Sequence, residues 1–130
     1  MTRPNQLILC IAMCIAWIST ASAEDCVKPE AEVTVPDGAM ASEAVMIAAS
    51  KSVRAFVNDG QAYVDCLQPS IDAATEAVRT AVKDSEEHQA VSRELLLLVS
   101  DHDAMVKAMQ DLAGDFNTSL KAYNARANAE

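Results

Sequence analysis

Apolar residues recur at alternating spacings of three and four over two long parts of the chain, which predicts helices with one buried face. Ser42 is a favourable N-cap for the first helix, and Glu43 places an acid where the helix dipole favours one. The turn signal Asn58-Asp59-Gly60 falls inside the pattern, but the apolar period passes through it unchanged. We therefore expect a continuous helix over about 42–67. Its apolar face consists of Met46, Ala49, Val53, Phe56, Gly60, Tyr63 and Leu67.

The second part runs from Ile71 to Tyr123 without a proline. Pro69 disfavours helical geometry at the residue before it, which predicts a boundary between the two parts. The apolar repeat of the second part slips at Asp84-Ser85-Glu86-Glu87, a segment with the composition of a helix start. We therefore expect two further helices, over about 70–83 and 85–127.

Residues 24–41 precede the first predicted helix and have the composition of an extended segment. Val33 and Val35 alternate with polar neighbours, and Pro36-Asp37-Gly38 is a turn signal. We expect this segment to run back along the first helix, with the two valines covering an apolar groove.

The N-terminus has the features of an export signal. Arg3 supplies a positive start, Leu7 to Ile18 an apolar run, and Ala21-Ser22-Ala23 a cleavage site of small residues. The run of about twelve residues is shorter than the roughly twenty that cross a bilayer. We expect a signal peptide over 1–23, cleavage after Ala23, and a periplasmic or secreted protein with no membrane span.

The charge of the chain restricts its partners. The full chain has 10 basic and 19 acidic residues and a net charge of −9, so removal of Arg3 with the signal leaves −10. Proteins that bind nucleic acids or anionic membranes neutralise negative charge with lysine and arginine. The charge therefore argues against these partners and favours cationic ones.

Two cysteines, Cys26 and Cys66, remain after cleavage. An even number of cysteines in an exported chain predicts a disulfide, with two free thiols or a soft-metal pair as the alternative. The bridge is within reach, because the segment from Cys26 to Ser42 can stretch to about 50 Å and the helix from Ser42 to Cys66 is roughly 36 Å long.

The expected fold is all-α, either a disulfide-tethered helical hairpin or an elongated three-helix, coiled-coil-like bundle, with an extended N-terminal segment. A single helix after residue 70 or a break near Ser100 are alternatives. The last helix, about 60 Å long, would outrun the first, at about 38 Å, so part of its apolar stripe would need another partner. We expect self-association or a protein ligand at this surface. Its residues are Leu95, Leu98, Met105, Met109, Leu112 and Phe116.

Several short motifs occur in an order that resembles a group of short exported proteobacterial helical proteins. They are C-x-x-P at Cys26, P-D-G at Pro36, Y-x-x-C-L at Tyr63 and an F-N pair at Phe116. The resemblance implies a periplasmic setting and a Cys26–Cys66 disulfide. It implies no activity and no ligand role for His102.

His102, Met105 and Met109 fall at i, i+3 and i+7 of the last helix and are the candidates for a metal site. Imidazole and thioether groups suit Cu(I) or Ag(I). Methionines on an apolar stripe are also ordinary core residues that fill irregular gaps. We favour core packing and expect no metal or cofactor.

No catalytic motif is present. Ser100 and His102 are two residues apart on a helix and do not face each other, so we expect no enzyme. The sequence favours an exported structural or binding protein. One alternative is an acid-responsive periplasmic chaperone, because 19 carboxylates lose negative charge and two histidines gain positive charge as the pH falls. The other alternative is a soft-metal binding protein.

Overall fold

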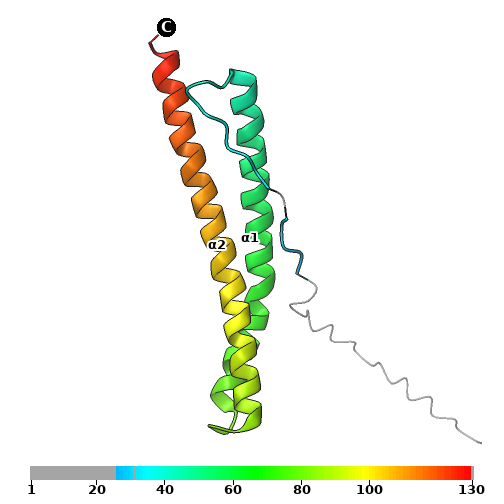
Figure 1. Cartoon of the computed structure of the whole chain (residues 1–130). Coiled ribbons are helices and arrows are strands. Elements are labelled where there is room, and N and C mark those ends of the chain that lie inside the picture. The colour runs from blue at the N-terminus through cyan, green and yellow to red at the C-terminus, as the bar shows by residue number, and fades with distance from the viewer. Residues whose placement is uncertain (1–25, 31, 130) are drawn as a thin grey trace, which may run out of the picture.

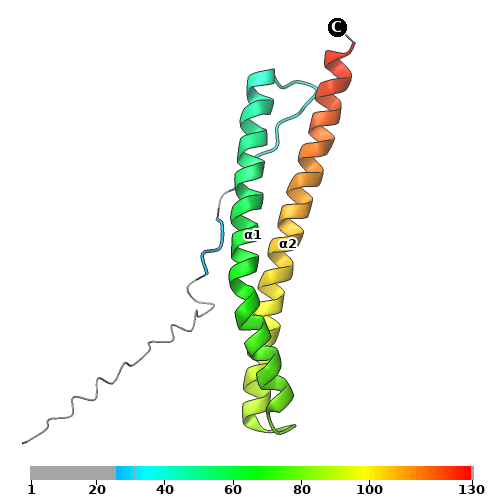
Figure 2. The same ribbon diagram turned by 180° about the vertical axis from the view of Figure 1, so that it is seen from behind.

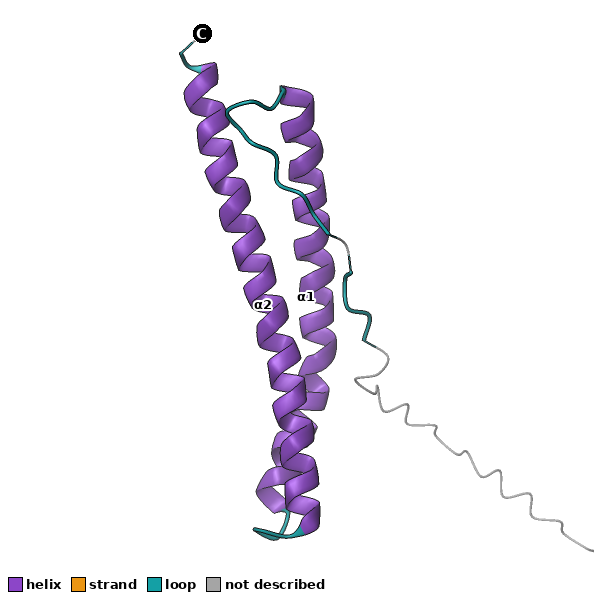
Figure 3. Cartoon of the chain, in the orientation of Figure 1, coloured by secondary structure: helices purple, strands orange, loops and turns teal. Residues whose placement is uncertain are grey.

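The computed structural model describes residues 26–30 and 32–129. These residues form two long helices, α1 (Glu43–Thr80) and α2 (Glu86–Ala127), which run antiparallel as a hairpin (Figure 1). The described part of the chain contains no strand (Figure 3), which confirms the prediction of an all-α protein. The predicted signal peptide and its cleavage site lie outside the described residues.

Helix α1 begins where the sequence predicts. The Ser42 hydroxyl accepts a hydrogen bond from the backbone N–H of Val45, which satisfies one of the free amides of the first turn. The predicted buried face is confirmed for six of its seven residues, and Phe56 is half-buried against the same core.

The predicted boundary at Pro69 was wrong, because α1 continues through this residue to Thr80. Proline inside a helix costs about 3 kcal/mol, since it removes one backbone hydrogen bond and crowds the preceding turn. Pro69 lies on the exposed side of α1, while Leu67 and Ala74 are buried in the core on either side of it. Packing against α2 on both sides of the proline therefore offsets the cost of the missing hydrogen bond.

The turn of the hairpin lies at residues 81–85, where the apolar repeat slips. Asp84 adopts a φ of 64°, a left-handed conformation that aspartate tolerates better than most residues. Ser85 is the N-cap of α2, and its hydroxyl accepts a hydrogen bond from the His88 backbone N–H at 3.0 Å. The predicted start of the last helix is thus confirmed.

The two helices are nearly equal in length, which corrects the expected mismatch. With 38 and 42 residues, α1 and α2 measure about 57 and 63 Å. They lie side by side in both views (Figures 1 and 2), so the apolar stripe of α2 faces α1 over most of its length.

The extended segment, residues 26–41, is fixed to α1 at its beginning. A disulfide joins Cys26 to Cys66, with 5.7 Å between the Cα atoms. From there the segment runs back along α1 towards its N-terminus, as the sequence predicts, and Val33 and Val35 are half-buried. A weaker link near the bridge joins Lys28 Nζ to Asp101 Oδ1 of α2 at 3.5 Å.

The segment then crosses to α2, which the sequence does not predict. Gly38 is buried against the backbone of α2, where an added Cβ would lie 1.7 Å from Ser119 O and 2.9 Å from Tyr123 N. The buried Ser119 hydroxyl donates a hydrogen bond to Pro36 O at 2.6 Å. No described glycine has a positive φ, so Gly38 is required here for space rather than for an unusual conformation.

Arg126 completes this contact near the end of α2. Its guanidinium donates hydrogen bonds to Ala39 O at 2.9 Å and to Ala41 O at 2.7 Å. The same group lies 5.3 Å from the centroid of the Tyr123 ring, a distance suited to a cation–π interaction. We call the contact of Pro36, Gly38 and Ala39 with Ser119 and Arg126 the clasp. The clasp and the disulfide hold the segment at both of its ends.

Substitution of Gly38 by alanine tests the clasp. We expect Gly38→Ala to lower the free energy of unfolding by about 1–3 kcal/mol, because the new methyl group overlaps the α2 backbone. Gly114→Ala is the control: a Cβ there meets nothing within 4 Å, and alanine in an exposed helical position stabilises by roughly 0.5–1 kcal/mol. Urea denaturation of both variants measures the difference, and equal effects would contradict the clasp.

Reduction of the disulfide is the second test of the fold. The bridge closes a loop of 40 residues, so we expect its loss to lower the free energy of unfolding by roughly 3–4 kcal/mol. Denaturation of the oxidised protein and of a Cys26→Ser/Cys66→Ser double variant measures this difference. An unchanged midpoint would show that the bridge does not constrain the chain.

Candidate functional site

The predicted interaction surface on α2 is instead the inside of the hairpin. Leu98, Met105 and Met109 are buried in one cluster with residues of α1, and Met105 is only 3 % exposed. Leu95, Leu112 and Phe116 are half-buried along the same stripe. Because α1 is long enough to run beside this stripe, these six residues contribute to the hairpin interface, and contact with a partner through them stays a prediction.

The two methionines fill a gap that a glycine creates. A Cβ added to Gly60 on α1 would lie 2.7 Å from Met109 Sδ and 3.0 Å from Met105 Sδ. Gly60 therefore admits two thioether side chains between the helices at a point where any larger residue would displace them.

The weak metal candidates His102, Met105 and Met109 lie on one side of α2, as predicted. His102 Nδ1 lies 3.0 Å from Asp103 Oδ1, and its side chain is 26 % exposed. Within the described residues no three histidine, cysteine or acidic side chains are grouped as a metal site. Met105 and Met109 are buried in the core, and the alternative of metal binding by this triplet is not tested by the structure.

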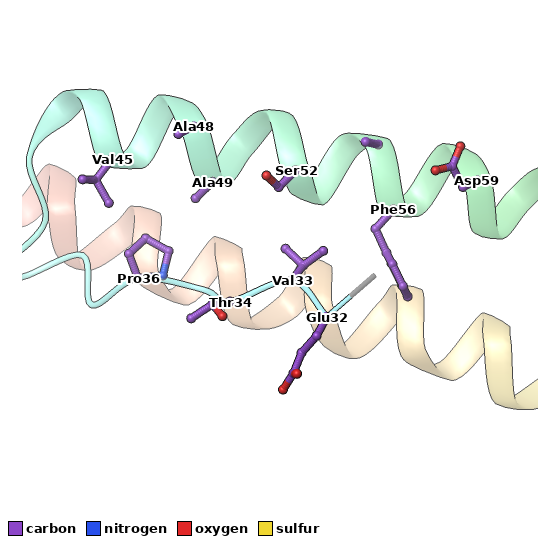
Figure 4. Close-up of a pocket in the computed structure, with 11 residues that line it drawn as sticks. Glu32, Val33, Thr34, Pro36, Val45, Ala48, Ala49, Ser52, Phe56 and Asp59 are labelled. Carbon is purple, nitrogen blue, oxygen red and sulfur yellow. The ribbon is translucent and has the colours of Figure 1, made fainter. Parts of the chain in front are cut away.

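An open groove lies between α1 and the extended segment, on a face of α1 that adjoins its core face (Figure 4). It has a volume of about 600 Å³. Val33, Thr34 and Pro36 line it from the segment, and Val33 points towards α1 in Figure 4. The helix contributes small and apolar side chains, namely Val45, Ala48, Ala49, Ser52, Ala55 and Phe56.

The charged residues of the groove are both acids. Glu32 on the segment and Asp59 on α1 lie towards one end, with the Glu32 side chain directed away from α1, whereas Val45 and Pro36 lie towards the other (Figure 4). Neither acid takes part in an ion pair with another described residue. A smaller hollow of about 260 Å³ shares Asp59 and continues past Ala62 to Val27 and Pro29. The groove is therefore apolar at one end and negative at the other.

The backbone of the segment beside the groove has free hydrogen-bonding groups. No hydrogen bond among the described residues involves the backbone of Glu32, Val33, Thr34 or Val35. Within the described residues these amides and carbonyls have no partner, because each turn of α1 and α2 satisfies its own backbone.

The pair with a resolved pKa shift, Glu76 and Arg79, lies far from the groove. Hydrogen bonds from Arg79 hold the pKa of the Glu76 carboxyl below its ordinary value, with Arg79 Nε 2.8 Å from Glu76 Oε2. Glu76 is 17 residues after Asp59, or about 26 Å along α1. This exposed pair supports the last turns of the helix and takes no part in the groove.

Comparison with protein-family models, with curated proteins and with solved structures finds no match to this chain. In the part of the chain that the structure describes, neither helix has the apolar length needed to cross a bilayer. The joined cysteines are compatible with the expected export. The proposed function therefore rests on the fold and the groove.

The sequence contains a second, weaker periodic pattern on α1, which corresponds to the face that lines the groove. Val45, Ala48, Ser52, Ala55 and Asp59 follow the same alternating spacing as the core face, displaced around the helix. Alanine and serine contribute little to an apolar pattern, so this second face is outweighed by the stronger one. The predicted covering of a groove by Val33 and Val35 placed the segment correctly, without indicating that space remains beside it.

Substitution in α2 distinguishes core residues from surface residues. We expect Met105→Ala to lower the free energy of unfolding by about 2–5 kcal/mol, because it removes a buried side chain and leaves a cavity. Leu97→Ala, at a position 70 % exposed, should change it by less than about 0.5 kcal/mol. Chemical denaturation measures both. A larger cost for Leu97→Ala would contradict the assignment of the two faces.

Proposed function

We propose that this chain is an exported binding module that holds a protein or peptide segment in the groove between α1 and the extended segment. The observation that carries the proposal is the open groove of about 600 Å³ beside a segment fixed at both ends. A volume of this size lies in the range of ligand sites, but the groove is open along its length. An elongated ligand fits such a shape better than a compact small molecule does.

The framework around the groove supports this proposal. Cys26 is joined to α1 and Gly38 is packed on α2, so the wall formed by residues 32–36 is attached to the hairpin on both sides. A site that exists before its ligand arrives avoids much of the ordering cost of binding. The fixed segment therefore favours recognition over a merely structural role.

The form of binding differs from the one that the sequence favours. Self-association through the α2 stripe requires exposed apolar residues, and that stripe is covered by α1. The groove lies on a neighbouring face of α1 and shares Ala49 and Phe56 with the core face. The expected class of function, an exported interaction protein, is kept, with a different surface.

A blocking substitution tests the proposed site. A peptide display library is selected on the mature oxidised chain, and the affinity of an enriched peptide is measured by fluorescence polarisation. We expect Ala55→Trp, which fills the groove, to weaken binding at least tenfold. Ala90→Trp, an equal enlargement at an exposed position of α2, should leave the affinity unchanged.

Two outcomes would contradict the proposal. One is that no peptide is enriched above the background of the unloaded support. The other is that Ala55→Trp and Ala90→Trp bind the enriched peptide equally well, although circular dichroism shows both variants to be folded.

A further inference from the structure

We propose that the ligand of this groove is an extended, cationic segment of about six residues, which pairs its backbone with Glu32–Val35 as an added strand. This inference rests on the proposed function, since it names the chemistry of the ligand at the same site. Three independent features of the groove lead to it: its length, the free backbone along its wall, and its charge.

The length of the groove sets the length of the ligand. Val45 and Asp59 mark its two ends on α1 and are 14 residues apart, which corresponds to about 21 Å along a helix. An extended chain rises about 3.4 Å per residue. Six residues in extended conformation therefore span the groove from end to end, whereas a six-residue helix would cover less than half of it.

The free backbone of the segment sets the conformation of the ligand. The stretch from Glu32 to Val35 is already extended, is held at both ends and makes no hydrogen bonds among the described residues. Such an edge can accept a further strand, whose main-chain hydrogen bonds supply affinity without requiring a particular sequence. Because the segment is fixed, the ligand pays no cost to straighten it.

The charge of the groove sets the charge of the ligand. Glu32 and Asp59 are the charged side chains that line it, and neither is neutralised by a basic partner among the described residues. A lysine or arginine at the acidic end and apolar side chains over Ala48 and Ala49 would match the two halves of the groove. A second copy fits less well, because it would bring the same acidic segment and a net charge near −10.

Synthetic peptides test the charge of the ligand. The probes are labelled hexapeptides of alternating valine and threonine with two lysines at one end, made in both orientations. Matched probes carry two glutamines or two glutamates instead. We expect the lysine probe to bind about three- to tenfold more tightly than the glutamine probe at low salt, and the difference to shrink at 0.5 M salt. Equal affinities of the lysine and glutamate probes would overturn the cationic assignment.

Proline substitutions test the added strand. The N–H groups of successive residues point to opposite edges of a strand, so Thr34→Pro removes a donor from one edge and Val33→Pro from the other. We expect one of the two to weaken the lysine probe at least fivefold relative to its control, Thr34→Ala or Val33→Ala. Disulfide mapping and thermal melting establish that each variant is folded. Retention of affinity by both proline variants would overturn strand addition.

The two levels of the proposal fail separately. If Ala55→Trp abolishes binding while charge and proline substitutions have no effect, the groove is a binding site and its ligand is of another kind. If light scattering instead shows a dimer that Ala55→Trp dissociates, the occupant is a second copy and the cationic ligand is ruled out.

Discussion

The close contact between Gly38 and the backbone of α2 is the constraint on which the form of this molecule depends. An antiparallel pair of helices has one buried interface and leaves the outer sides of both helices to solvent. Here the chain before α1 is joined to that helix by Cys26 and is packed on the other helix by Gly38. The two attachments hold the extended segment across the hairpin. The segment forms a groove with α1 that two helices alone would not have.

The core of the hairpin is formed mainly by the two helices, and Cys26 of the segment packs against it. Leu67, Met105 and Met109 belong to one buried cluster, and Gly60 provides the space for the methionine sulfurs. A chain with so few aromatic residues must obtain its packing from alanine, valine, leucine and methionine. The segment therefore adds a wall and a proposed site beside two helices that bury most of their apolar stripes against each other.

The sequence predicted the local features of this fold better than their consequences. Caps and turn signals at Ser42, Ser85 and Gly38 act through neighbouring residues, so their composition indicates them directly. Pro69 was misleading, because its local preference against helix is overridden by packing of the residues on either side. The apolar spacing of Tyr63, Leu67, Ile71 and Ala74 continues across Pro69 and indicates an unbroken helix. Because of this error we predicted a first helix that was too short and an apolar stripe on α2 that this helix could not cover. The crossing of the segment to α2 depends on contacts between residues more than 80 positions apart, such as Ser119 with Pro36, which no local pattern reveals.

The extended segment is attached to both helices at once. Nuclear Overhauser effects between the Gly38 α protons and the backbone amide of Tyr123 in the oxidised mature protein test it most directly. We expect a strong nuclear Overhauser effect, because Gly38 packs directly on this part of the α2 backbone. The absence of any effect between Gly38 and residues 119–123, in protein whose Cys26–Cys66 bridge is intact, would contradict the account.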